Sequence, residues 1–165
     1  MKTVVLIRHA KTHTESESGR DYDRTLQSRG MQDAIAMSKR LFELGLLPEC
    51  LISSTAIRAQ FTAELIKTDF PNPVPIVYAK ELYSGFPDAY LQAIHSADEH
   101  YGVIGIIGHN PAITLLANSL ASDNVTDSMQ TCSVISLEFE NAQSWADIQV
   151  NKGICKQYLF PKQTS

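Results

Sequence analysis

Short, unbroken runs of aliphatic residues, each followed by a helical pattern, constrain this chain more than any other feature of its sequence. The clearest runs are residues 3–7, 50–53 and 103–107, and a weaker one covers residues 76–78. Runs without polar alternation are typical of parallel strands, because helices cover both faces of such strands. The sequence therefore predicts a mostly parallel sheet.

The segments between these runs have the period of amphipathic helices. In residues 27–44, which Gly45 ends, the apolar positions predict an inner face made of Met31, Ala34, Ile35, Leu41 and Phe42. In residues 56–67, the same reasoning predicts an inner face made of Ile57, Phe61 and Leu65.

Two further helices are marked by their first residues. Pro87 opens one of them, because proline is well tolerated at the first helical position. Asn110 and Pro111 are predicted to be the N-cap and first residue of another helix, which runs to about Leu120.

The end of the chain has a different pattern. Polar and apolar residues alternate over residues 134–139, which predicts a strand with one solvated face at the edge of the sheet, paired with residues 156–160. Strands that alternate with helices predict an α/β protein, here a three-layer α/β/α sandwich with a mostly parallel central sheet. We expect a single domain over residues 1–165.

Cationic and imidazole side chains follow three of the predicted strands. Arg8 and His9 follow the first, Arg58 lies in the first turn after the second, and His109 follows the strand at residues 103–107. Because ligands bind at the shared carboxyl edge of parallel strands, we expect these four side chains to meet in one pocket.

Their chemistry suits a phosphoryl group. A guanidinium fork matches phosphate oxygens, and the start of a helix adds free N–H groups at the same place. An uncharged imidazole is a competent nucleophile, so His9 can attack phosphorus if a carbonyl group in the following loop holds its other ring nitrogen. Two arginines and a protonated His109 would then stabilise the dispersed charge of the transition state.

Several other classes of function are disfavoured. The formal net charge is −4, so the chain has no overall basic surface for nucleic acid. The apolar opening segment is too short for a membrane span or a secretory signal, and we expect a cytoplasmic protein. The three cysteines do not have the spacing of a disulfide framework or a zinc site. Flanking arginines would repel a metal ion from His9, His13 and His109.

The chain resembles the histidine phosphatase superfamily, branch 1, which is phosphoglycerate mutase-like, and within it the small SixA-type phosphohistidine phosphatases. The matching segments, which together span most of the chain, are RHAKT at residues 8–12, DRTLQSRG at 23–30, SSTAIRAQFTA at 53–63, GHNP at 108–111 and the region 131–145. Together and in this order they are a specific signature.

The resemblance implies roles for several residues. It implies that His9 accepts the phosphoryl group, that Arg8, Arg58 and His109 form the phosphate pocket, and that no metal or other cofactor is required. It also implies that Arg24 lines the entrance, and Asn110 is counted among the substrate-binding residues because it follows His109.

The general acid for the leaving group is less clearly marked. Larger relatives use a glutamate from a loop after a central strand, which makes Glu81 the candidate here, with Asp88 a weaker one. Without such an acid, phosphohistidine would be favoured, because a phosphoramidate leaves more readily than an alcohol. We therefore expect a phosphorylated protein as partner, or else a small phosphorylated substrate.

Two alternatives remain. One is a small-molecule phosphomonoesterase or an enzyme like phosphoglycerate mutase. The other is a phosphate-binding module without catalysis, which the presence of both His9 and His109 disfavours.

Overall fold

The computed structural model describes residues 1–161. In chain order the elements are β1 (Lys2–Arg8), the 3-10 turn η1 (Asp21–Asp23), α1 (Ser28–Glu43), β2 (Cys50–Ser53), α2 (Ile57–Ile66), β3 (Ile76–Tyr78), α3 (Glu81–Ser84), α4 (Pro87–His95), β4 (Val103–Gly108), α5 (Ala112–Leu120), β5 (Val134–Phe139), η2 (Trp145–Asp147) and β6 (Ile154–Leu159).

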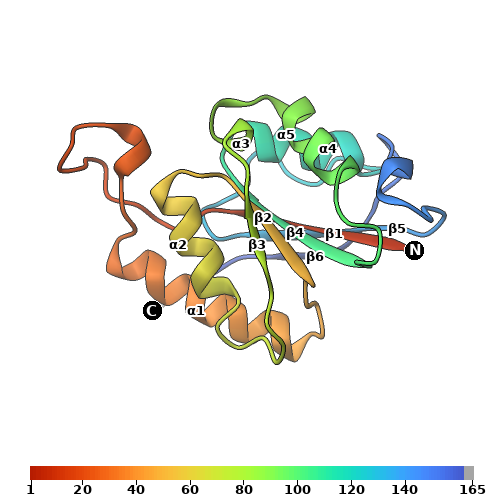
Figure 1. Ribbon diagram of the computed structural model, residues 1–165, viewed down its shortest axis with the longest axis horizontal. Helices are drawn as coiled ribbons and strands as arrows, with labels where there is room; N and C mark the ends of the chain where they lie inside the picture. The colour runs from red at the N-terminus through yellow and green to blue at the C-terminus, as the bar shows by residue number, and fades with distance from the viewer. Residues whose placement is uncertain (162–165) are drawn as a thin grey trace.

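The strands form one mixed sheet in the order β3-β2-β4-β1-β5-β6. The pairs β3–β2, β2–β4 and β4–β1 are parallel, while β5 runs antiparallel to β1 and to β6. Helices α1 and α2 cover one face of the sheet, and α4 and α5 cover the other (Figure 1). The predicted α/β sandwich with a mostly parallel sheet is confirmed.

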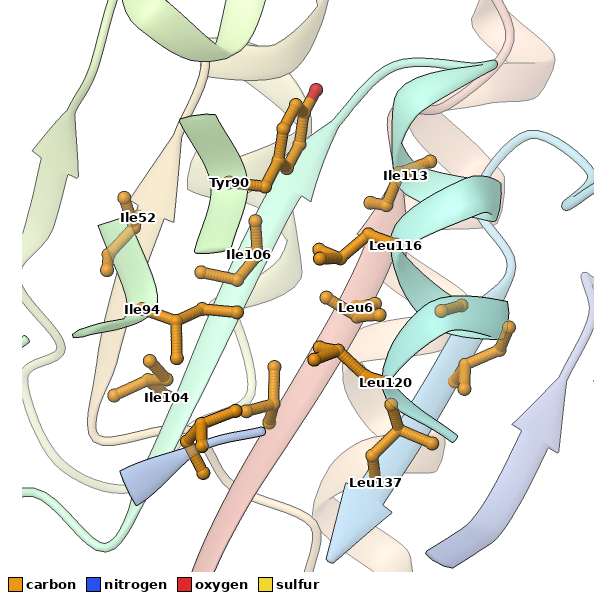
Figure 2. Close-up of a cluster of buried hydrophobic side chains, with 14 of the residues drawn as sticks. Leu6, Ile52, Tyr90, Ile94, Ile104, Ile106, Ile113, Leu116, Leu120 and Leu137 are labelled. Atoms are coloured by element: carbon orange, nitrogen blue, oxygen red, sulfur yellow. The ribbon is translucent and has the colours of Figure 1, made fainter. Parts of the chain in front are cut away.

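The central strands divide their side chains between two apolar layers, as successive residues of a strand must. Leu6 of β1 and Ile106 of β4 face Leu116 of α5 and Ile94 of α4, as Figure 2 shows. Val5 and Ile7 and their neighbours on the opposite face pack beneath α1 and α2. All of these strand residues are fully buried, which explains why β1 and β4 contain no polar alternation.

The predicted position of the strand at residues 134–139 is wrong, although its pairing with residues 156–160 is confirmed. β5 lies inside the sheet between β1 and β6, and the edge strand is β6. Val134 joins the apolar layer under α1, and Ile135 joins the layer under α5, so both faces of β5 are covered. Ser136, which suggested a solvated face, is buried.

The predicted inner face of α1 is wrong at three positions. Met31, Ile35 and Phe42 are each more than 40% exposed, and the residues that face the sheet are Gly30, Ala34, Met37, Ser38 and Leu41. Helix α1 lies close to the loop after β1 at Gly30. A Cβ atom added at Gly30 would lie 2.2 Å from the carbonyl oxygen of Lys11, so only glycine fits at this position. Contact with the loop after β1 therefore decides which face is buried.

Helix α2 is likewise rotated from the predicted orientation. Phe61 is 51% exposed, while the buried residues are Arg58, Ala59, Thr62, Ala63 and Ile66. Thr62 Oγ1 accepts a hydrogen bond from the Ala10 N–H at 2.9 Å and donates one to the Arg58 carbonyl oxygen at 2.7 Å. Polar contacts with the end of β1 thus turn Arg58 and Thr62 inward.

Among residues 1–161, no helix combines the length and hydrophobicity that crossing a bilayer requires.

Candidate active site

A cavity of about 710 Å³ lies where β1, β2 and β4 end at the carboxyl edge of the sheet. It brings together six of the predicted site residues, namely Arg8, His9, Arg24, Arg58, His109 and Asn110. Glu81 does not line this cavity: as the first residue of α3, it lines a separate cavity of about 560 Å³. Tyr83 and Ser84, from the same short helix, line the cavity with the two histidines.

His9 and His109 lie side by side because the strands before them are neighbours in parallel register. The His9 N–H donates to the Gly108 carbonyl oxygen at 3.1 Å, and the two imidazole centroids are 5.2 Å apart. Both residues are buried, with 5% and 7% of their surface exposed. Two imidazoles that are distant in sequence therefore share one cavity.

The ring of His9 has a defined tautomer. Its Nδ1 lies 2.8 Å from the Ala10 carbonyl oxygen, which can only accept a hydrogen bond, so Nδ1 carries the proton. This leaves the lone pair on Nε2. Burial lowers the pKa of His9 to about 3; the contact with Ala10 opposes this shift, and the nearby His109, Arg58 and Arg8 reinforce it. His9 is thus an uncharged imidazole with a free lone pair at neutral pH.

His109 is also uncharged in the free protein. Its Nε2 lies 2.7 Å from Ser54 Oγ, and its backbone N–H donates to the hydroxyl of Tyr90 at 3.1 Å. Burial, followed by the charge of Arg58, lowers the pKa of His109 to about 4. The expected protonated form is therefore absent until a negative charge enters the cavity and raises this pKa.

Arg8, which is partly buried, and Arg58, which is buried, have donors that no protein atom satisfies. Arg8 Nη1 donates to the Met129 carbonyl oxygen at 2.8 Å, and burial, followed by the charge of Arg58, lowers the pKa of Arg8. Arg58, in the first turn of α2, donates from Nη1 to the Asp21 carbonyl oxygen at 2.8 Å and from Nη2 to Asp21 Oδ2 at 2.9 Å. In both residues the buried Nε lacks a partner.

These unpaired groups are concentrated at this cavity. In residues 1–161, four buried side-chain nitrogen or oxygen atoms have no hydrogen-bond partner: Arg8 Nε, Arg58 Nε, His109 Nδ1 and Ser136 Oγ. Three of the four belong to residues that line the cavity. A buried donor without a partner typically costs about 1–3 kcal/mol, so a group of them indicates a place for a ligand that accepts hydrogen bonds.

Arg24 and Asn110 each border the cavity in a different way. Arg24 Nε donates to Asp21 Oδ1 at 3.0 Å, and its Nη1 donates to the His13 carbonyl oxygen. Asn110 is not the N-cap that was predicted, because α5 begins at Ala112, and no side-chain cap is formed. Its side chain instead donates to the Met129 carbonyl oxygen at 2.9 Å and accepts from Thr114, which ties α5 to the loop that also holds Arg8.

Asp21 and Tyr83 are among the cavity residues that sequence reasoning missed. Tyr83 donates its hydroxyl to Asp21 Oδ2 at 2.8 Å, and its ring packs edge-on against His109 with centroids 5.7 Å apart. The spacing of Asp21 and Arg24, three residues apart in the loop after β1, was the available signal for the first. Nothing in the sequence distinguishes Tyr83 from an ordinary helix residue.

The described residues contain no group of three or more histidine, cysteine, aspartate or glutamate side chains placed to hold a metal ion. The cavity is lined by two imidazoles, three guanidinium groups, the ammonium group of Lys11, the amide of Asn110, one carboxylate and several hydroxyl groups.

Comparison with known proteins agrees with this geometry. The model of the histidine phosphatase superfamily (branch 1) matches residues 4–83, which include Arg8, His9 and Arg58. The structure of SixA from Agrobacterium tumefaciens aligns with a TM-score of 0.83 at 24% identity, covering 97% of this chain and 98% of that one. The structure of the protein histidine phosphatase SixA complexed with tungstate aligns with a TM-score of 0.78 at 21% identity, covering 96% and 97%.

The sequence also has relatives whose activity is uncharacterized. A chloroplast protein of Arabidopsis thaliana is 28% identical over 88% of this chain and 70% of its own length. A protein of Mycobacterium tuberculosis is 28% identical over 87% of this chain and 92% of its own length. The fold is that of the histidine phosphatases. By sequence, residues 4–83 are similar to the histidine phosphatase superfamily, branch 1.

Proposed function

We propose that this protein is a metal-independent phosphatase that transfers a phosphoryl group to His9 and then hydrolyses the phosphohistidine intermediate, with phosphohistidine in proteins as its substrate. The observation that carries the proposal is the set of unpaired buried nitrogens, Arg8 Nε, Arg58 Nε and His109 Nδ1, around an uncharged imidazole. A tetrahedral oxyanion supplies acceptors to both arginine donors, and to His109 Nδ1 when the bound charge raises the pKa of that ring and protonates it.

The nucleophile is His9 Nε2. Its lone pair is available because the Ala10 carbonyl oxygen holds the proton on Nδ1, and the low pKa keeps the ring uncharged at neutral pH. Attack forms a bond from Nε2 to phosphorus while the bond from phosphorus to the leaving group breaks. Water then attacks the phosphorylated His9 and releases inorganic phosphate.

The cationic groups stabilise the transition state. Phosphoryl transfer spreads charge over the equatorial oxygens, so catalysis is mostly positioning and electrostatic stabilisation. Arg8 and Arg58 are held in place by Met129 and Asp21, so little reorganisation is needed when the charge develops. The incoming negative charge also raises the pKa of His109, which becomes a further cationic donor.

Phosphohistidine is favoured over a phosphate ester because Asp21, the one carboxyl group among the described residues that line the cavity, has a lowered pKa and is ionised at neutral pH. The candidate acid Glu81 lines the separate cavity. An alcohol needs a proton as it leaves, whereas the ring of phosphohistidine can leave as a neutral imidazole. The likeness to SixA, which is described as a protein histidine phosphatase and has been solved with the tetrahedral anion tungstate, supports the same choice.

The proposal is tested by turnover of four substrates: a phosphohistidine peptide, p-nitrophenyl phosphate, a sugar phosphate and a phosphoserine peptide. We expect the phosphohistidine peptide to be turned over fastest, the phosphoserine peptide slowest, and EDTA to have no effect. An acid-labile label should appear on His9 after brief incubation with substrate and be absent from His9→Ala. Equal rates on all four substrates, or a preference for the sugar phosphate or for bisphosphoglycerate, would contradict the assigned substrate.

A further inference from the structure

Asp21 is the one carboxylate among the described residues that line the cavity. Its Oδ2 accepts from Arg58 Nη2 at 2.9 Å and from the Tyr83 hydroxyl at 2.8 Å, and its Oδ1 accepts from Arg24 Nε at 3.0 Å. These donors come from α2, α3 and the end of the η1 turn. Three separate elements therefore hold this carboxylate in one position.

The carboxylate stays ionised. Partial burial acts to raise the pKa of Asp21, but hydrogen bonds from Tyr83 and Arg58 and the charges of Arg58 and Arg24 outweigh it, so the pKa lies below its ordinary value. An acid of this kind has no proton to give at neutral pH. Asp21 is thus an acceptor and a negative charge in a cavity that is otherwise cationic.

Asp21 is much more exposed than His9, which places it toward the open side of the cavity. His9 is at the floor, with 5% of its surface exposed, whereas the side chain of Asp21 is 54% exposed. Phosphoryl transfer places the attacking and leaving atoms roughly in line on opposite sides of phosphorus. A phosphoryl group between them would have His9 beneath it and its leaving group facing outward, toward the rim that carries Asp21.

We propose that Asp21 is a specificity-determining residue that selects phosphorylated imidazole by accepting a hydrogen bond from the second ring nitrogen of the substrate's phosphohistidine. This inference rests on the proposed function. The ring of phosphohistidine bears phosphorus on one nitrogen and carries an N–H on the other when protonated. Asp21 stabilises this cationic ring.

The step balances without any proton transfer. The bond from phosphorus to the substrate nitrogen breaks and its electron pair stays on that nitrogen, while His9 Nε2 supplies the pair for the new bond to phosphorus. The substrate ring keeps its other N–H and leaves as neutral imidazole. A phosphate ester differs because its oxygen leaves with a negative charge, which an ionised Asp21 repels and cannot protonate.

The test compares two substrates in the variant Asp21→Asn. One is a phosphohistidine peptide, and the other is p-nitrophenyl phosphate, whose leaving group needs no proton and carries no N–H. The substitution also loosens Arg58, which lowers both rates, so the ratio of the two kcat/KM values is the measure. We expect this ratio to fall about tenfold, the size typical of a lost hydrogen bond to a charged group.

Asp23→Asn is the matched control. Asp23 lies in the same η1 turn, but it pairs with Arg20 and Ser18 and does not line the cavity. The same chemical change there should leave the ratio within about twofold of the unmodified protein, as surface substitutions usually do.

A pH profile separates recognition from a purely structural role. The alkaline limb of kcat for the phosphohistidine peptide reports loss of the ring proton in the bound substrate. Removing the charge of Asp21 should move that limb about one pH unit lower, since a neighbouring opposite charge typically accounts for a shift of this size. The profile for p-nitrophenyl phosphate should lack this displacement.

The outcomes distinguish the two proposals. If the unmodified protein turns over neither substrate, the proposed function fails. If it is active and Asp21→Asn lowers both rates equally, with no displacement of the alkaline limb, Asp21 only positions Arg58 and the inference is overturned.

Discussion

Helix α3 separates two cavities that differ in almost every property except size. On one side, Glu81 and Leu82 line a cavity of about 560 Å³ whose walls are mostly apolar, among them Ile52 and Val77. On the other side, Tyr83 and Ser84 line the cavity of about 710 Å³ that holds the two histidines. A short helix thus contributes to both.

The difference shows which property marks a site. Among the described residues, the apolar cavity contains no buried polar side-chain atom that lacks a partner, whereas the polar cavity has three. Each such atom destabilises the folded protein unless a ligand completes it. Volume alone would not separate the two cavities, but the unpaired donors do.

Removing the nucleophile should have the largest effect. His9→Ala is expected to lower turnover of a phosphohistidine peptide at least about a thousandfold, as the loss of a covalent nucleophile does in other enzymes. Val77→Ala in the apolar cavity is the control, and stopped-flow or discontinuous phosphate release measures both. Substantial residual activity in His9→Ala would mean that the two cavities have been assigned wrongly.

The next largest effect is expected for Arg58→Ala, at about a hundredfold in kcat/KM, the usual cost of removing one donor to a charged transition state. Arg58→Lys should recover only part of this, because an ammonium group lacks the planar fork that holds Asp21 with two nitrogens. Steady-state kinetics on p-nitrophenyl phosphate separates kcat from KM. Full recovery by lysine would show that only the charge matters.

The buried histidines should make the protein less stable in acid. Their folded pKa values, about 3 for His9 and about 4 for His109, lie below the ordinary 6.5, so the unfolded chain binds protons first as the pH falls. Unfolding is therefore favoured progressively below about pH 6.5, by about 2 kcal/mol per histidine at pH 5.

Urea denaturation at pH 7 and pH 5 measures this loss. His9→Gln and His109→Gln should each reduce the difference between the free energies of unfolding measured at pH 7 and at pH 5. An unchanged difference in both variants would show that other groups are responsible for the acid sensitivity.

The Tyr90 hydroxyl links Leu82, which lines the apolar cavity, to His109, which lines the other cavity. We expect its removal to have a smaller effect, on the stability of the fold. It donates to the Leu82 carbonyl oxygen at 2.9 Å and accepts from the His109 N–H at 3.1 Å. Tyr90→Phe leaves both groups unpaired, so we expect a loss of about 1–3 kcal/mol in the free energy of unfolding. Thermal or urea denaturation measures it, and no change would indicate that water replaces the hydroxyl.

The smallest effect is expected at Glu81. Because Glu81 lines the apolar cavity, Glu81→Gln should change kcat/KM by no more than about twofold on any of the four substrates. A selective loss on the phosphoserine peptide would instead indicate that Glu81 reaches the leaving group as an acid.

The central strands and the meeting of Arg8, His9, Arg58 and His109 could be predicted because both follow from local pattern and from the shared edge of parallel strands. The roles of these residues remain predictions until the variants are measured. The sequence indicates where each strand ends, and the residues just after those ends are the ones that meet in the cavity.

The helix faces could not be predicted from apolar periodicity, because polar contacts and backbone approach decide them. α1 turns Gly30 toward the loop after β1, and α2 turns Arg58 and Thr62 toward the site, which leaves Ile35 and Phe61 half exposed. Apolar periodicity takes account of apolar residues only, whereas the buried face of α2 also includes the polar residues Arg58 and Thr62.

Asp21 and Tyr83 escaped notice for a related reason. Their contact links a loop turn to a helix that is distant in sequence, and the spacing of Asp21 from Arg24 is the one local signal at either position. The interior position of β5 was missed as well, since alternation of residues cannot show that β6 covers the far edge.

The contact between His9 Nδ1 and the Ala10 carbonyl oxygen has a consequence for the chemical identity of the intermediate. Since Nδ1 is protonated, phosphorylation is confined to the nitrogen farther from the main chain, and one regioisomer of the modified histidine, the τ form, should accumulate. Antibodies that discriminate the τ and π isomers can therefore test this single backbone contact. Detection of the π isomer on His9 would mean that the imidazole ring has rotated and that Nδ1 no longer donates to Ala10.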